Sequence, residues 1–142
     1  MIRKFKYSDL DFVSEIWLDT NIKAHSFIEK EYFISNLEEV KKAFLDAEIY
    51  VYENDKTKEI QGFIGLIGNY IAGIFVKYGC QSKGIGKNLL DYTKTIKSSI
   101  NLKVYKKNNR GVNFYLREGF SIKSEDLDDF TKEVELNMAW EK

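Results

Sequence analysis

A glycine-containing turn, Gln81-Ser82-Lys83-Gly84-Ile85-Gly86, separates an apolar run from a segment with helical periodicity. A turn that opens a helix presents unpaired backbone N–H groups to an anion, and the helix dipole adds positive potential at the same place. Gly84 and Gly86 allow phosphate oxygens to approach the backbone closely, and Lys83 and Lys87 add charge beside them. The turn is therefore a candidate phosphate-binding loop.

Two nucleotide-binding motifs also begin with a glycine-containing turn of this kind, and neither fits the residues here. A P-loop requires Gly, four residues and Gly-Lys followed by Ser or Thr, but Asn88 follows Gly86-Lys87 here, and Gln81 stands where the first glycine belongs. A dinucleotide-binding fingerprint requires a third glycine, and its position is occupied by Leu89. A glycine-rich helix start without a ligand is an alternative that the turn by itself leaves open.

Residues spread over 74–120 resemble the GNAT superfamily of N-acetyltransferases: Ile74-Phe75-Val76, the turn at 81–86, Asn108, Phe114-Tyr115 and Gly119-Phe120. Gln/Arg-x-x-Gly-x-Gly/Ala is that family's acetyl-CoA signature. Asn-x-x-Ala-x-x-Phe-Tyr followed by Gly-Phe is its second block, present here with Gly111 in the Ala position. The first half, with Trp17-Leu18-Asp19 and His25-Ser26-Phe27-Ile28, is similar to small bacterial GNAT enzymes related to lysine and protein acetyltransferases.

The resemblance implies a set of acetyl-CoA-binding residues. Backbone groups of the strand at 74–76 would pair with the amides of pantetheine, as an added strand pairs with a sheet edge. This strand and the one at 100–105 would splay apart and open a wedge for the thioester. The turn would hold the pyrophosphate, and Asn108 would bind the pantetheine arm or cap the helix that follows it. The expected residues are Ile74, Phe75, Val76, Gln81, Ser82, Lys83, Gly84, Ile85, Gly86, Lys87 and Asn108. A basic cluster of Lys106, Lys107 and Arg110 would meet the 3′-phosphate or form ordinary surface charge.

Tyr115 is the catalytic candidate that the resemblance supplies. A tyrosine is protonated at neutral pH, with a reference pKa near 10, so it can donate a proton to the departing coenzyme A thiolate. The general base is left open. His25 is the single histidine of the chain and titrates near neutrality without help, and it and Tyr70 are candidates for the acceptor site. An acetyl-cysteine on Cys80 is disfavoured, because the family transfers acetyl directly in a ternary complex.

Hydrophobic periodicity gives the elements that must position these residues. The expected order is β-α-α-β-β-β-α-β-α-β-β, which predicts an α/β (α+β layered) domain. The resemblance implies that this domain is a GNAT fold, with a mixed, mostly antiparallel twisted sheet of six to seven strands and about four helices. Ser8 and Asp11 suggest a capping box that opens the first helix. Strands are expected at 2–6, 48–53, 60–67, 70–76, 100–105, 120–124 and 134–140, and the other helices at 29–46, 84–98 and 109–118.

Two further sequence expectations complete the scaffold. The apolar run 70–76 is typical of a strand buried on both faces. The acidic stretch Glu125 to Asp129 is expected to be a loop between the last two strands. Residues 1–142 are expected to form one acetyltransferase domain.

Composition limits the partners. Lys plus Arg and Asp plus Glu number 22 each, so the chain has no overall basic field and nucleic acid is not an expected partner. The single cysteine excludes an internal disulfide framework. No apolar run approaches the ~20 residues of a membrane span, and the N-terminus lacks a signal-peptide h-region. A cytoplasmic protein, monomeric or homodimeric, is expected, with no membrane partner and no metal.

The favoured function is direct transfer of acetyl from acetyl-CoA to a primary amine, either a small molecule or a protein lysine or N-terminus. The alternatives are a non-catalytic acyl-CoA sensor and a transferase that uses another acyl-CoA. No sequence rule identifies which amine accepts the acetyl group.

Overall fold

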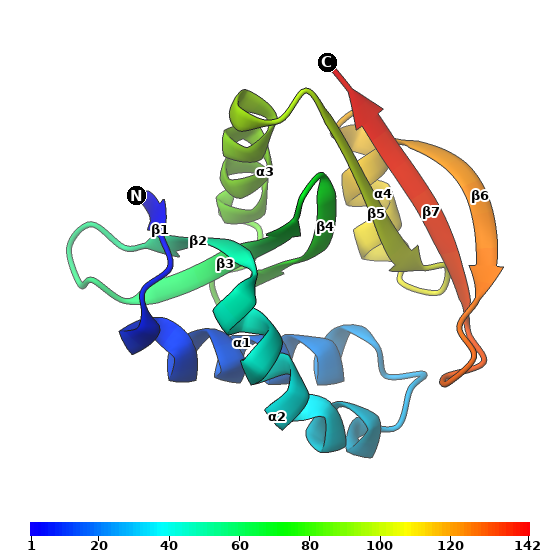
Figure 1. Ribbon diagram of the computed structural model, residues 1–142, viewed down its shortest axis with the longest axis horizontal. Coiled ribbons are helices and arrows are strands. Elements are labelled where there is room, and N and C mark those ends of the chain that lie inside the picture. The colour runs from blue at the N-terminus through cyan, green and yellow to red at the C-terminus, as the bar shows by residue number, and fades with distance from the viewer.

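The computed structural model describes residues 1–142 and contains a seven-stranded sheet in the order β1-β2-β3-β4-β5-β7-β6 (Figure 1). Helices α1 and α2 cover one face, and α3 and α4 cover the other. The strands are β1 (Ile2–Lys4), β2 (Glu48–Glu53), β3 (Ile60–Ile67), β4 (Tyr70–Val76), β5 (Ser99–Tyr105), β6 (Ser121–Leu127) and β7 (Val134–Glu141). The helices are α1 (Leu10–Ala24), α2 (Lys30–Asp46), α3 (Ile85–Ile96) and α4 (Asn109–Arg117). The expected fold class and element order are confirmed.

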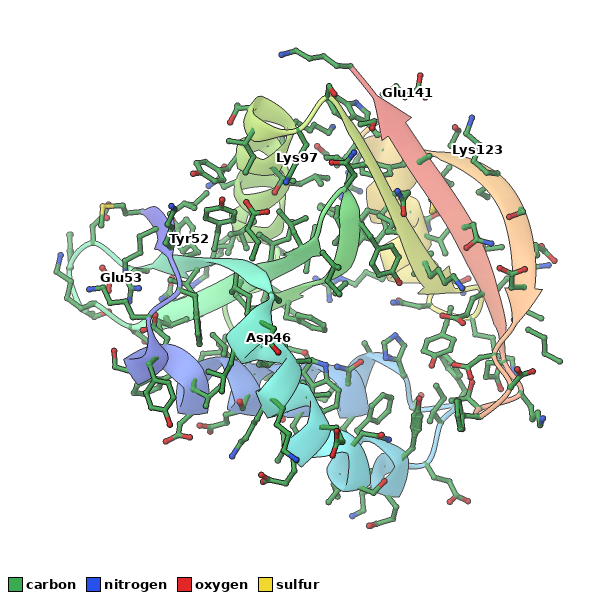
Figure 2. The ribbon with its side chains drawn as sticks, viewed as in Figure 1. Asp46, Tyr52, Glu53, Lys97, Lys123 and Glu141 are labelled. Carbon is green, nitrogen blue, oxygen red and sulfur yellow. The ribbon has the colours of Figure 1, made fainter.

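The two faces of the sheet carry separate hydrophobic cores. Side chains alternate along β2, so that Tyr50 joins the cluster under α3 and α4 while Ile49 and Val51 join the cluster under α1. Tyr52 packs at the margin of the first cluster (Figure 2). None of the helices is both long and apolar enough to cross a bilayer.

Strands β4 and β5 run parallel and separate after a short contact. Their pairing is restricted to Tyr70 with Asn101 and Ile71 with Leu102. Beyond that point β5 stays paired with β7 along its whole length, whereas β4 follows β3. The remainder of β4 therefore has no strand partner on its β5 side, and a wedge opens in the middle of the sheet.

The separation corrects the expectation that β4 is buried on both faces. Ile71 is buried, but Ala72 is exposed and the residues from Gly73 to Val76 are half-buried. The apolar run has the same composition as a core strand. In the structure its apolar side chains border an open wedge instead of a neighbouring strand.

Two other expectations are wrong at element ends. Ser8 does not cap α1, because residues 7–9 form a 3₁₀ turn in which Asp9 accepts the Lys6 backbone N–H at 2.8 Å. Asp9 also pairs with Arg3 at 2.8 Å, so the turn is held by a carboxylate that also binds β1. The stretch 125–127 belongs to β6 and is not a loop, because it pairs with residues 134–136 of β7. Charged residues are suited to β6, since this edge strand is exposed at every position.

Candidate functional site

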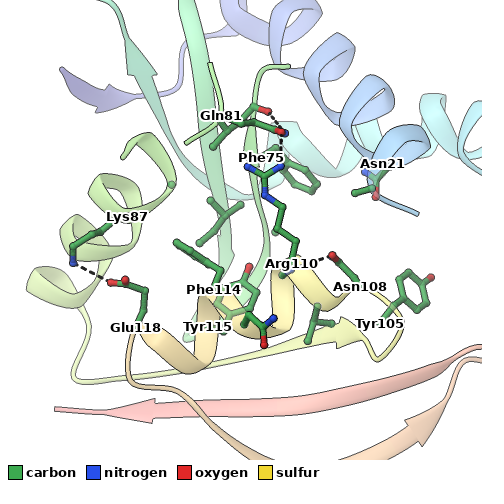
Figure 3. Close-up of a pocket in the computed structure, with 18 of the residues that line it drawn as sticks. Asn21, Phe75, Gln81, Lys87, Tyr105, Asn108, Arg110, Phe114, Tyr115 and Glu118 are labelled. Atoms are coloured by element: carbon green, nitrogen blue, oxygen red, sulfur yellow. Dashed lines mark hydrogen bonds and ion pairs between the residues drawn. The ribbon is translucent and has the colours of Figure 1, made fainter. Parts of the chain in front are cut away.

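A cavity of about 860 Å³ lies where β4 and β5 separate (Figure 3). Its lining comes from α1, β4, the loop before α3, the first turn of α3, β5, α4 and β7. Polar groups gather at both ends, and apolar side chains of β4 and α4 lie between them. The site is thus assembled around the break in the sheet.

The loop before α3 presents a run of free backbone donors. None of the N–H groups of residues 81–87 donates a hydrogen bond within the protein, and the first intrahelical bond runs from Asn88 N–H to the Gly84 oxygen at 2.9 Å. Gly84 has φ +82°, a conformation that a residue with Cβ adopts only with strain. This part of the cavity has the donors, the helix dipole and the curvature to bind a phosphate.

Arg110 links α4 to this loop across the cavity (Figure 3). Its guanidinium donates to Gln81 Oε1 at 3.0 Å and to Ser82 Oγ at 3.1 Å. Gln81 Nε2 in turn donates to the Val76 carbonyl at 3.2 Å, which shows that this carbonyl of β4 faces the cavity and not β3. The Arg110 charge is balanced by no carboxylate within the protein, so the guanidinium is placed to meet an anion.

The other predicted basic residues are already paired. Lys106 lies 3.0 Å from Glu125 and Lys107 lies 3.2 Å from Glu133. Lys87 lines the cavity and lies 3.0 Å from Glu118 (Figure 3). Lys83 does not line the cavity. Of the predicted cluster of Lys106, Lys107 and Arg110, Arg110 alone therefore faces the cavity.

Tyr115 lies on α4, and its side chain forms part of the cavity wall. Its side chain is 9% exposed, and its ring packs against Phe114 and Phe120. The hydroxyl has no hydrogen-bond partner, yet no fully buried polar side-chain atom is left unpaired, so the hydroxyl reaches the cavity space. Burial, and the neighbouring Tyr70, raise the pKa of Tyr115. The phenol therefore stays protonated at neutral pH.

His25 and Asn108 form a chain of contacts between α1 and α4. Asn108 Oδ1 accepts the Gly111 N–H at 3.0 Å and so caps α4, while its Nδ2 lies 3.4 Å from His25 Nε2. His25 Nδ1 lies 3.1 Å from Asn21 Oδ1. Because that oxygen can only accept, Nδ1 carries the proton, and Nε2 faces the Asn108 donor. Burial lowers the pKa of His25 to about 4, so the ring is neutral and both nitrogens are engaged.

The departure from the family block at Gly111 has a physical reason. A Cβ on this residue would lie 2.6 Å from Asn108 Nδ2 and 3.0 Å from Asn108 Cγ. The Asn108 amide lies directly over Gly111 as it extends toward His25. Glycine at this position therefore accommodates the contact that links α4 to α1.

The structure brings nearly all the predicted site residues into one cavity. The following line it: Ile74, Phe75, Val76, Gln81, Ser82, Gly84, Ile85, Gly86, Lys87, Asn108, Tyr115, His25 and Tyr70. Lys83 is the exception, and Cys80 also lies outside the lining. Sequence reasoning missed Tyr105 and Glu135, which line the cavity from β5 and β7. Tyr105 is the last residue of β5, and ligands often bind at the carboxyl ends of strands, so its position could have marked it as a site residue. No feature of the sequence marks Glu135 as a site residue.

Comparison with known proteins agrees with this geometry. A family model described as "Acetyltransferase (GNAT) domain" matches residues 46–122. Peptidyl-lysine N-acetyltransferase YiaC of Escherichia coli (strain K12) is 32% identical over 142 residues, covering 99% of this chain and 96% of that protein.

Two solved structures share the fold. The solution structure of apo-form YjaB from Escherichia coli has a TM-score of 0.87 at 22% identity, covering 99% of this chain and 96% of that one. The crystal structure of PaiA N-acetyltransferase from Thermoplasma acidophilum in complex with coenzyme A has a TM-score of 0.84 at 22% identity, covering 100% and 98%. The matched family model, the identity to YiaC and the shared fold together establish that this chain belongs to the GNAT superfamily of N-acetyltransferases.

Proposed function

We propose that the protein transfers the acetyl group of acetyl-CoA directly to the side-chain amine of lysine residues in peptides or proteins. Acetyl transfer to an amine follows from the family. The lysine acceptor is supported by the similarity to YiaC, which is named as a peptidyl-lysine enzyme.

One observation carries the proposal: a single cavity joins the free N–H groups of residues 81–87, the unpaired edge of β4 and the Tyr115 hydroxyl. Acetyl-CoA matches this sequence of groups along its length. Its pyrophosphate suits the N–H groups and Arg110, and the amides of its pantetheine arm suit a strand edge. Its thioester would then lie toward Tyr115, where a departing sulfur needs a proton.

The reaction requires two proton movements. An acceptor amine attacks the thioester carbonyl carbon with its lone pair, a C–N bond forms and the C–S bond breaks. Tyr115 donates its phenolic proton to the leaving sulfur and recovers a proton from the newly bonded nitrogen. The raised pKa of Tyr115 keeps the proton available throughout the neutral range. Proton donors of this kind contribute roughly 10²–10⁴-fold to rate.

The proposal is tested by a thiol-release assay with acetyl-CoA and three acceptor classes: lysine peptides blocked at the N-terminus, peptides with a free N-terminus and no lysine, and small amines. Release of coenzyme A with the first class, together with mass-spectrometric detection of acetyl-lysine, is expected. Release with the other classes alone would overturn the lysine acceptor.

A non-catalytic sensor gives a different result in the same experiment. Such a protein would bind acetyl-CoA in calorimetry and release no coenzyme A with any amine. Propionyl-CoA and succinyl-CoA, measured in parallel, establish whether acetyl is the preferred acyl group.

A further inference from the structure

Glu135 is a carboxylate in the cavity wall without a partner. It lies on β7, is half-buried and lines the cavity. Neighbouring acidic residues are engaged: Glu133 pairs with Lys107 at 3.2 Å, Glu125 pairs with Lys106 at 3.0 Å, and Asp128 accepts from the Tyr105 hydroxyl at 3.1 Å. No hydrogen bond or ion pair is formed by the Glu135 side chain within the protein, so the group is available to a ligand.

Glu135 lies at the end of the cavity away from the loop 81–87, which we call the acceptor end. It stands opposite Tyr105 in the β5–β7 register, at the point where β5 ends and the wedge is open. Burial raises the pKa of Tyr70, and the charge of Glu135 raises it further. Glu135, Tyr70 and Tyr115 all line the same cavity, so the carboxylate and the proposed proton donor share one space.

Burial and the charged groups around Glu135 make its carboxylate a better proton acceptor. Burial raises its pKa, the charges of Asp128 and Asp126 raise it further, and Lys103 lowers it. Tyr70 on β4 and Tyr32 on α2 are the other titratable groups that sense its charge. The result is a carboxylate that is a stronger base than an exposed glutamate.

We propose that Glu135 binds the ammonium group of the acceptor lysine and accepts the proton that the amine loses before attack. This inference rests on the proposed function. The ammonium transfers one proton to the Glu135 carboxylate and becomes an amine with a lone pair, and the carboxylic acid then releases that proton to solvent. His25 is not suited to this step, because both of its ring nitrogens are engaged by Asn21 and Asn108.

The experiment compares wild type with Glu135→Gln, which keeps the size of the side chain and removes its charge. With a lysine peptide at neutral pH, kcat/KM is expected to fall about 10²-fold, the lower end of general-base contributions. KM for acetyl-CoA is expected to stay within about twofold, because Glu135 lies away from the phosphate loop. Glu141→Gln is the matched control, because it makes the same substitution on the same strand at an exposed position outside the cavity lining.

A pH profile separates base catalysis from a structural role. In Glu135→Gln the reaction depends on free amine from solution, so kcat/KM should rise about tenfold per pH unit toward the lysine pKa near 10. Wild type should reach a plateau at lower pH. With 2,2,2-trifluoroethylamine, which is uncharged at neutral pH, the two proteins should differ by less than about threefold.

Each other outcome has a distinct meaning. Equal kcat/KM for the lysine peptide in wild type and Glu135→Gln overturns the assignment. So does a loss that is the same for trifluoroethylamine and does not recover at high pH, since it would report damage to the fold. Absence of lysine acetylation by wild type overturns the proposed function itself and is seen before any variant is tested.

Discussion

The two ends of the cavity are built in different ways. At the proposed phosphate end the cavity presents mainly backbone N–H groups of residues 81–87, which are adjacent in the sequence and belong to one loop and one helix turn. At the acceptor end the cavity is lined by side chains from five elements, namely Asn21, Tyr70, Tyr105, Asn108 and Glu135 with their neighbours. A contiguous backbone site leaves a short motif in the sequence, whereas a site assembled from distant side chains does not.

The largest expected effect lies where the two ends meet. Tyr115→Phe removes the proposed proton donor and keeps the ring that packs against Phe114 and Phe120. We expect kcat to fall about 10²–10⁴-fold while the Kd for acetyl-CoA, measured by calorimetry, is unchanged. Tyr92→Phe, a substitution in an aromatic pair outside the cavity, is the control. An unchanged kcat in Tyr115→Phe would remove Tyr115 from the mechanism.

The contacts from Asn21 through His25 to Asn108, which join α1 to α4, are expected to weaken in acid. The pKa of His25 is about 4 in the folded protein and near 6.5 when unfolded, so the unfolded state binds more protons between these values. Stability from the neutral ring is present above the unfolded pKa and is lost as pH falls toward 4. Between pH 7 and 5 we expect a loss of about 1–2 kcal/mol, allowing for partial solvent contact.

Urea unfolding at the two pH values measures this loss. His25→Gln, which cannot titrate, is the comparison, and its free energy of unfolding should change less over the same range. Identical pH dependence in both proteins would show that His25 is not the group responsible.

The phosphate end alone should respond to Arg110→Ala. Because Arg110 is the member of the Lys106, Lys107 and Arg110 cluster that reaches the loop, we expect the Kd for acetyl-CoA to rise about tenfold, in the range of one charge-assisted hydrogen bond. The Kd should depend less on salt than in wild type, and KM for the amine should be unaffected. Lys106→Ala, which breaks an exposed pair with Glu125, should bind as wild type does; equal losses in both variants would contradict the assignment.

The smallest effect is expected at Gly111. Alanine there favours helix by about 1 kcal/mol but places a Cβ 2.6 Å from Asn108 Nδ2. The Asn108 amide must move away from His25, so we expect about a threefold weaker Kd for acetyl-CoA, less than the worth of a full hydrogen bond, with thermal stability nearly unchanged. Gly65→Ala, on β3 outside the cavity lining, controls for substitution of a glycine, because an added Cβ there has no neighbour closer than 4.0 Å. A full wild-type affinity in Gly111→Ala would mean that the Asn108 position has no bearing on the cofactor.

What the sequence predicts also differs between the two ends of the cavity. Hydrophobic period was enough for the element order. The motifs that resemble the family led to the loop at 81–86 and to Tyr115, which the structure brings to one cavity, because each motif consists of residues close together in the chain. The wedge was implied by the family resemblance and not by composition, since an apolar strand that borders a cavity has the composition of a core strand, as β4 does. Glu135 was missed because its role depends on the register of β7 against β5, which brings it opposite Tyr105. Nothing in the local sequence specifies that register.

The early separation of β4 and β5 also bears on how the protein avoids self-association. A strand without a neighbour is a template for a foreign strand, and proteins normally protect such edges at the rim of a sheet. Here the unpaired edge of β4 lies inside the molecule. Residues of α4 line the same cavity, and Arg110 of α4 contacts Gln81 of the loop that follows β4. A polypeptide strand carries side chains on both faces, whereas the pantetheine arm is a bare amide chain. An edge placed inside a cavity is therefore less accessible to a foreign strand than an edge at the rim of the sheet.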